Sequence, residues 1–233
     1  MYRKPVLKVR NLYKAYKNGG RTHLILRNVN FEVYPGEFVA ILGRSGSGKS
    51  TLLNLIAGLD RPSYGHIYVD GVDTVYLSET ELTRLRREKI GFIFQDYNLI
   101  GSLTVLENVI LAMEAKKMYS PSQRRKAALE ILSRVELLHV AEKYPSELSG
   151  GEKQRAAVAR AIAKKPSIIL ADEPTGALDT KTKNQVMNLM EKLNKEYNTT
   201  FLIVTHDPEI AKTSTRQLYI KDGEILQATT ITP

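Results

Sequence analysis

One stretch of eight residues constrains the fold of this 233-residue chain more than any other feature. It runs Gly43-Arg44-Ser45-Gly46-Ser47-Gly48-Lys49-Ser50 and matches the phosphate-binding loop pattern G-x-x-x-x-G-K-[ST]. The apolar run Phe38–Leu42 precedes it and the apolar run Thr51–Leu59 follows it, which predicts a buried strand, a loop and a helix. The glycines allow backbone N–H groups to point at phosphate oxygens, and the helix start adds a positive dipole end. In such a loop Lys49 contacts the β- and γ-phosphates, and the hydroxyl of Ser50 can bind Mg²⁺.

The composition is that of an ordinary globular protein, with 42% hydrophobic and 25% charged residues. The length suits one large domain, or one domain with a smaller insert. The chain has no cysteine, which excludes disulfides, thiolate metal sites and cysteine nucleophiles. No run of 18 apolar residues occurs, so we expect no membrane span. The net charge of +9 fits a nucleic-acid partner, an anionic membrane surface or a solvated exterior, and alone it does not choose among them.

The hydrophobic pattern predicts an α/β fold in three parts. Short apolar runs separated by Gly-containing turns predict a small antiparallel sheet, at Val6–Val9, Leu24–Val33 and Ile67–Val69. From about residue 104 to 142 the period is helical, and Leu129, Leu132, Val135 and Leu138 fit one face.

The last part predicts a parallel sheet covered by helices. Its strands are the apolar runs Ile168–Ala171 and Phe201–Val204, with a helix at about 181–196 between them. A closing hairpin follows, with strands at Gln217–Ile220 and Glu224–Leu226.

A second acidic element follows one of these strands. The run Ile168–Ala171 ends in Asp172 and Glu173, at the carboxyl end of a predicted strand, where α/β folds bind ligands. Asp172 is suited to hold Mg²⁺ through water, and Glu173 could polarise a water for attack on a γ-phosphate. Alone, the pattern would favour a strand that runs into an acidic turn. Together with the phosphate-binding loop it favours a catalytic site.

The stretch Leu148-Ser149-Gly150-Gly151-Glu152 precedes a predicted helix from Lys153 to about Ala163. Ser149 and Glu152 have capping-box spacing, which explains these two residues without any ligand. Two glycines in a first turn each cost up to about 1 kcal/mol relative to alanine, but they allow a phosphate to approach the bare N–H groups. The chain therefore contains two anion-binding helix starts, and the spacing does not show whether one chain can bring them together.

The order of the motifs resembles the nucleotide-binding subunit of ABC transporters over nearly the whole chain. The phosphate-binding loop is followed by Phe94-Gln95, Leu148 to Glu152, Asp172-Glu173, Ala177-Leu178-Asp179 and Thr205-His206-Asp207. The resemblance implies a P-loop NTPase (RecA-like) core of about residues 1–95 and 160–233, and a helical subdomain of about 96–159. It also implies a head-to-tail homodimer with two ATP molecules, each held by the loop of one chain and by Ser149, Gly150 and Gly151 of the other.

The resemblance also implies roles for single residues. The catalytic residues would be Lys49, Gln95, Glu173 and His206. Glu173 would be the general base, and His206 would hydrogen-bond the γ-phosphate. Mg²⁺ would be held by Ser50, Gln95 and Asp172. ATP would contact Tyr16, Gly43, Arg44, Ser45, Gly46, Ser47, Gly48, Lys49, Ser50, Thr51, Gln95, Ser149, Gly150, Gly151, Glu152, Asp172 and Asp179.

Four of these assignments need a further remark. Tyr16 would stack on adenine, with Tyr13 as the competing candidate and packing on the sheet as the alternative role. Asp179 would lie in the loop that crosses the dimer interface. Glu152 stands where many relatives have glutamine, but the capping role is preserved. Arg44 occupies a free loop position and could contact phosphate or the partner chain.

Three further stretches resemble the subgroup that includes MacB, LolD, FtsE and the antimicrobial-peptide detoxification transporters: Glu81–Arg87, Gly91–Leu99 and Leu103–Val109. This subgroup implies a cytoplasmic ATPase on the inner face of the cell membrane, which powers a separate MacB/FtsX-like permease by export or mechanotransmission of a peptide, antibiotic or lipoprotein. Alternatives are FtsE-like signalling to a division or cell-wall-hydrolase complex, and an ABC ATPase acting on nucleic acid, a partner we do not expect. The glycine-rich second helix start argues against a P-loop kinase or GTPase.

Overall fold

The computed structural model describes residues 3–114 and 119–230. A six-stranded sheet forms its centre, in the order β10-β9-β3-β8-β7-β6. Its strands β6, β7, β8, β3 and β9 are parallel, and β10 pairs antiparallel with β9 at the edge. Their bounds are β3 Phe38–Leu42, β6 Ile90–Ile93, β7 Ile168–Asp172, β8 Thr200–Thr205, β9 Arg216–Lys221 and β10 Glu224–Thr230.

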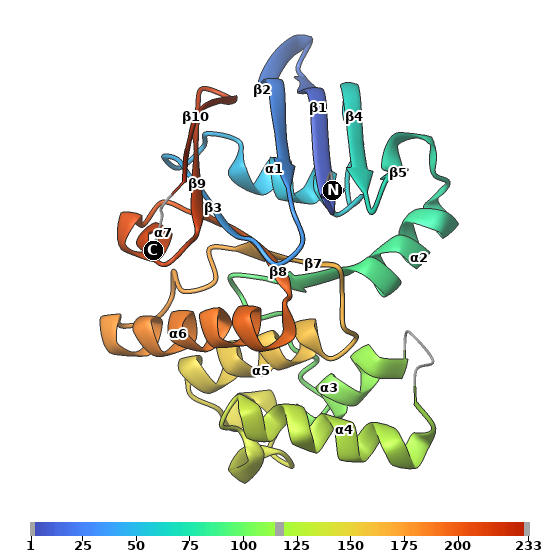
Figure 1. Cartoon of the computed structure of the whole chain (residues 1–233), viewed down its shortest axis with the longest axis vertical. Coiled ribbons are helices and arrows are strands. Elements are labelled where there is room, and N and C mark those ends of the chain that lie inside the picture. Colours follow the sequence, from blue (N-terminus) through green and yellow to red (C-terminus); the bar gives the residue numbers. More distant parts are fainter. Residues whose placement is uncertain (1–2, 115–118, 231–233) are drawn as a thin grey trace.

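A second sheet of four antiparallel strands lies at one end of the molecule, in the order β2-β1-β4-β5 (Figure 1). Its strands are β1 Leu7–Asn18, β2 Arg21–Val33, β4 Tyr64–Val69 and β5 Val72–Asp73. The helices α3 and α4 lie at the opposite end, with α5 and α6 between them and the central sheet. The structure thus confirms an α/β fold with an antiparallel β portion and a helical portion.

The helices are of ordinary length. They are α1 Lys49–Ile56, α2 Glu79–Lys89, α3 Val105–Glu114, α4 Pro121–Arg134, α5 Gly150–Ile162, α6 Thr180–Tyr197 and α7 Pro208–Lys212. Short 3₁₀ turns lie at η1 Thr74–Tyr76, η2 Leu138–Val140 and η3 Pro145–Glu147. Among the described residues, no helix combines the length and apolar character that crossing a membrane requires.

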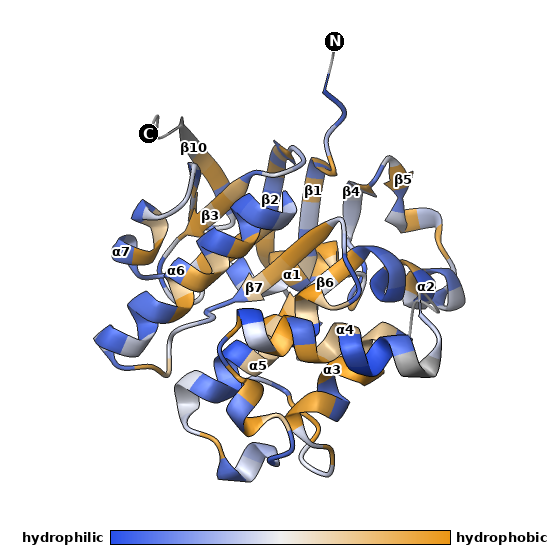
Figure 2. Cartoon of the chain, turned by 60° about the horizontal axis from the view of Figure 1, so that its bottom comes forward, coloured by the Kyte–Doolittle hydropathy of each residue, from blue (hydrophilic) through white to orange (hydrophobic). Residues whose placement is uncertain are grey.

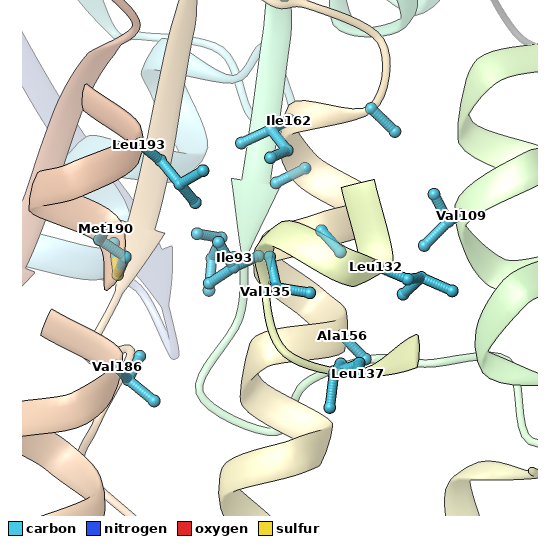
Figure 3. Close-up of a cluster of buried hydrophobic side chains, with 14 of the residues drawn as sticks. Ile93, Val109, Leu132, Val135, Leu137, Ala156, Ile162, Val186, Met190 and Leu193 are labelled. Atoms are coloured by element: carbon cyan, nitrogen blue, oxygen red, sulfur yellow. The ribbon is translucent and has the colours of Figure 1, made fainter. Parts of the chain in front are cut away.

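Both faces of the central sheet are covered, which explains why its strands read as continuous apolar runs. One hydrophobic cluster fills the space between the sheet and helices α3 to α6 (Figure 3). In it, Ile93 of β6 lies beside Val135, while α6 contributes Val186 and Met190. A second cluster fills the other face, toward α1 and the antiparallel sheet. Figure 2 shows the result, with hydrophobic strands inside and hydrophilic outer faces on the helices.

Two details of the sequence-based prediction are wrong. Leu138 does not share the buried face of Leu132, because α4 ends at Arg134 and Glu136 then takes a left-handed φ of 60°. Leu138 lies in η2 instead and is 52% exposed. The first helix begins at Lys49, earlier than the predicted Thr51, because Gly48 with φ 97° forms its N-cap. It ends at Ile56, before the predicted Leu59.

Candidate functional site

The phosphate-binding loop joins β3 to α1 and encloses its own lysine. Lys49 is 7% exposed, and its Nζ donates to the carbonyl oxygens of Gly43 at 2.8 Å and Arg44 at 3.1 Å. Gly48 has φ 97°, and a Cβ there would lie 2.8 Å from the side chain of Leu26. The loop can therefore take this course only with glycine at that position. The ammonium group is held inside the curve of the loop, where a phosphate group would meet it.

The residues that end β7 and β8 lie beside this loop. Ser50 Oγ donates to Asp172 Oδ1 at 3.0 Å. Glu173 Oε1 lies 2.9 Å from His206 Nδ1 and 3.8 Å from Lys49 Nζ. The structure thus brings together five of the predicted site residues, from three separate parts of the sequence.

Glu173 has two properties that set it apart from a surface glutamate. Its side chain is 14% exposed. Its backbone has a φ of 43°, in the left-handed region that residues other than glycine rarely adopt. Its N–H donates to Val204 O of the neighbouring strand at 3.0 Å, which holds the residue in this conformation. Such backbone outliers persist where the surrounding structure holds them, and they cluster at functional sites.

These groups surround a cavity of about 1020 Å³. Its size is at the upper end of the range for small-molecule sites. Most of the lining residues are those predicted to bind nucleotide, and the complete set is Ile25, Leu42, Gly43, Arg44, Ser45, Gly46, Gly48, Lys49, Ser50, Thr51, Gln95, Glu173, His206, Pro208 and Tyr219.

Four lining residues were not predicted as site residues: Ile25, Leu42, Pro208 and Tyr219. Tyr219 lies opposite Leu42 because β9 pairs with β3. Ile25 comes from β2, in the antiparallel sheet. No motif marks either residue, and only the pairing of distant strands would have identified them.

The oxygen groups beside the loop fit a magnesium ion. Magnesium takes few protein ligands and completes its shell with water and phosphate oxygens. The hydroxyl of Ser50 and the carboxylate of Asp172 already meet, and Ser47 Oγ is buried without a hydrogen-bond partner. Gln95 lines the same cavity. Burial raises the pKa of the Asp172 carboxyl, which indicates that its charged form lacks a full set of partners.

Tyr16 lies near this cavity but does not line it. Its hydroxyl donates to Asp60 Oδ2 at 2.7 Å, and Lys14 Nζ lies 4.6 Å from the centre of its ring. Burial and the bond to Asp60 raise the pKa of the Tyr16 hydroxyl. Tyr13 packs edge-on against Tyr64, with ring centroids 6.1 Å apart. The ring of Tyr13 is thus occupied within the sheet, while Tyr16 remains 43% exposed.

The second glycine-rich helix start is a complete capping box. Ser149 Oγ accepts from Glu152 N at 3.3 Å, and Glu152 Oε2 accepts from Ser149 N at 2.8 Å. The helix begins at Gly150 rather than at the predicted Lys153. A Cβ on Gly151 would lie 2.5 Å from Thr182 Cγ2, so close packing against α6 is a second reason for glycine there. None of these residues lines the cavity at the phosphate-binding loop.

Asp179 caps the start of α6. Its Oδ1 accepts from Lys181 N at 3.0 Å and from Thr182 N at 3.1 Å. The bonds from Thr182 lower the pKa of the Asp179 carboxyl. Its predicted place at a dimer interface remains a prediction.

Comparisons with known proteins agree with this geometry. The family model for ABC transporters matches residues 26–176. The ABC transporter ATP-binding protein MJ0796 of Methanocaldococcus jannaschii is 50% identical over 223 residues, which cover 94% of this chain and 95% of MJ0796. The bacitracin export ATP-binding protein BceA of Halalkalibacterium halodurans is 42% identical over 224 residues, which cover 94% of this chain and 87% of BceA.

The fold agrees with solved structures as well. A dimeric structure of the MJ0796 ATP-binding cassette, in a post-hydrolysis state with bound ADP and Pi, has a TM-score of 0.90 to this chain. The two are 48% identical, and the match covers 97% of this chain and 99% of the solved one.

Proposed function

Because this chain belongs to the ABC transporter family, we propose that it is the ATP-hydrolysing subunit for a separate membrane permease, and that two copies close head to tail around two ATP molecules. The observation that carries the proposal is the contact of Glu173 with His206 and Lys49 inside the cavity at the phosphate-binding loop. A carboxylate, an imidazole and an ammonium group converge there on the place where a γ-phosphate would lie.

Each of these groups has a role in our proposal. Lys49 and the backbone N–H groups of the loop hold the phosphates. Glu173 accepts a proton from the attacking water, and His206 donates a hydrogen bond that orients the γ-phosphate. Mg²⁺, when bound by Ser50, Gln95 and Asp172, would neutralise phosphate charge.

The dimer is supported by the position of the second glycine-rich helix start. Gly150 lies outside the cavity of its own chain, so a phosphate in that cavity would meet such a helix only on another chain. The relative MJ0796 has been solved as a dimer, which agrees with this arrangement. We propose that about residues 96–159 act as the helical subdomain that carries this contact, and that 1–95 and 160–233 form the ATP-binding core.

Substitution of the proposed base tests the composite site. Glu173→Gln should lose hydrolysis but keep ATP, and should form a dimer with ATP that light scattering after gel filtration detects. Adding Gly150→Asp should restore the monomer, because aspartate suits a helix start but repels phosphate. Glu209→Gln, an exposed control on α7, should behave as wild type. A Glu173→Gln protein that stays monomeric with saturating ATP, or one that still hydrolyses it, contradicts the proposal.

A groove of about 260 Å³ supports a docked permease segment. Phe92 and Phe94 stack in it with ring centroids 4.1 Å apart, and Leu59 beside them is 52% exposed. Phe94 directly precedes Gln95, which lines the nucleotide cavity. The groove is lined by Ala57, Leu59, Arg86, Ile90, Phe92, Phe94, Ala112, Arg160, Ala161 and Lys164. Its apolar floor and basic residues fit an amphipathic permease helix with acidic residues, at the inner face of the membrane.

Purification from membranes tests this docking. Leu59→Asp should lose the co-purifying permease and keep nucleotide binding. Leu138→Asp is the matched control, since Leu138 is also 52% exposed but lies outside the groove. For the transport mode, we propose MacB-like export or mechanotransmission, because the relative BceA is a bacitracin export ATP-binding protein. The sequence of the captured permease distinguishes such an exporter from FtsE-like signalling. Salt-sensitive DNA binding without any permease would refute both the exporter and the signalling proposal.

A further inference from the structure

Lys183 of α6 makes an ion pair with Asp207, the residue that follows His206. Its Nζ lies 2.5 Å from Asp207 Oδ2. The side chains are 18% and 25% exposed, against 72% and 35% for Lys195 and Glu191, an ion pair on the same helix. Such a sheltered pair is screened less by water than an ordinary surface pair.

Asp207 is held firmly from its other side as well. Its Oδ1 accepts from Glu209 N at 2.9 Å and caps α7, and its own N–H donates to Thr205 Oγ1 at 3.0 Å. The bond from Lys183 is the main cause that lowers the pKa of the Asp207 carboxyl, which agrees with a charged pair. By contrast, the side chain of His206 is 64% exposed, and its ring contacts Glu173.

The ion pair joins the two loops that carry the reacting groups. Glu173 follows β7, and the chain then reaches Asp179, the N-cap of α6, with Lys183 one turn further along. His206 and Asp207 follow β8. Lys183 therefore ties the segment that leaves Glu173 to the segment that holds His206.

From these contacts we infer that Lys183 is a positioning residue for ATP hydrolysis, which holds His206 beside Glu173 through Asp207. The inference rests on the proposed role of His206 at the γ-phosphate. Lys183 does not line the nucleotide cavity, so its effect falls on turnover rather than on ATP binding.

The first test compares kcat and KM for ATP among substitutions of Lys183. Lys183→Met keeps a long helix-forming side chain but removes the charge. It should lower kcat about tenfold, equivalent to about 1.4 kcal/mol, with KM within about twofold of wild type. Lys183→Arg should restore most of kcat. Lys195→Met breaks the exposed pair on the same helix and is the matched control, with no change in either constant.

The second test is a double-mutant cycle with Asp207→Asn, which keeps a capping side chain but loses the charge. If the pair acts as a unit, Lys183→Met should add little to the loss caused by Asp207→Asn. Additive losses, a KM effect without a kcat effect, or no rescue by arginine would overturn the inference.

His206→Ala separates the inference from the proposed function. If His206→Ala loses turnover while Lys183→Met keeps the wild-type kcat, the inference fails and the role of His206 stands. If His206→Ala turns over like wild type, the proposed role of His206 fails, and the inference fails with it.

Discussion

The hydroxyl of Ser50 donates a hydrogen bond of 3.0 Å to the carboxylate of Asp172, although the two residues lie 122 positions apart in the sequence. Ser50 is in the first turn of α1, and Asp172 is the last residue of β7. The parallel sheet makes this contact possible, because the carboxyl ends of β3 and β7 lie at the same edge with β8 between them. The two elements that the sequence marks as phosphate-binding and acidic thus form one site.

Asp172→Asn should make the nucleotide-free protein more stable and a poorer ATPase. Burial raises the pKa of this carboxyl in the folded state, so its charge destabilises the fold above that pKa, and the cost disappears as the pH falls through it. Removing the charge should raise Tm at neutral pH by about 2 °C, measured in a metal chelator. ATP turnover should fall about 10–100-fold, the usual loss for an outer-shell metal partner. Unchanged turnover at limiting Mg²⁺ would contradict the assignment.

Local patterns predicted the parts of the site that depend on neighbouring residues. The phosphate-binding loop, the carboxylates after β7 and the Ser149 capping box each lie within a short stretch, where spacing and residue type carry the information. Tyr219 could not be predicted as a cavity residue, since it lies there through strand pairing between β9 and β3. Gly151 was assigned to phosphate approach alone, because its close contact with Thr182 joins two separate helices.

The end of α4 provides a direct comparison of two leucines that share a helical spacing in the sequence. Leu132 is fully buried among α3, α5 and η2 residues, whereas Leu138 is 52% exposed. Leu132→Ala should lower the free energy of unfolding by about 2–5 kcal/mol, the cost of an unfilled core cavity. Leu138→Ala should change it by less than about 0.5 kcal/mol. Urea unfolding followed by circular dichroism measures both, and equal losses would show that the helix continues past Arg134.

Replacing Glu152 with glutamine should remove a pH-dependent part of the stability while keeping the cap. The bonds from Ser149 lower the pKa of the Glu152 carboxyl below its usual 4.5. Its charge therefore stabilises the fold above that pH, and the contribution is lost as the pH falls through the folded-state pKa. Glu152→Gln should be less stable at neutral pH by about 0.5 kcal/mol, the value of an anion at an exposed helix start. The difference in unfolding free energy between the two proteins should shrink toward pH 3 in urea titrations. A difference that stays constant with pH would mean that the geometry of the cap, and not the charge of Glu152, causes the loss of stability.

The two tyrosines of β1 can be separated by their effect on ATP affinity. Tyr16→Ala removes the exposed ring and should weaken ATP binding about tenfold, within the range for one aromatic ring stacked on one base. Tyr16→Phe keeps the ring and loses the hydroxyl, which bonds to Asp60 and interacts with Thr51, so its affinity should stay within about threefold of wild type. Tyr13→Ala removes the contact with Tyr64 and should lower Tm, but it should leave the affinity unchanged, because that ring packs within the sheet. Displacement of a fluorescent ATP analogue measures all three; if Tyr13→Ala weakens binding and Tyr16→Ala does not, the adenine stacks on Tyr13.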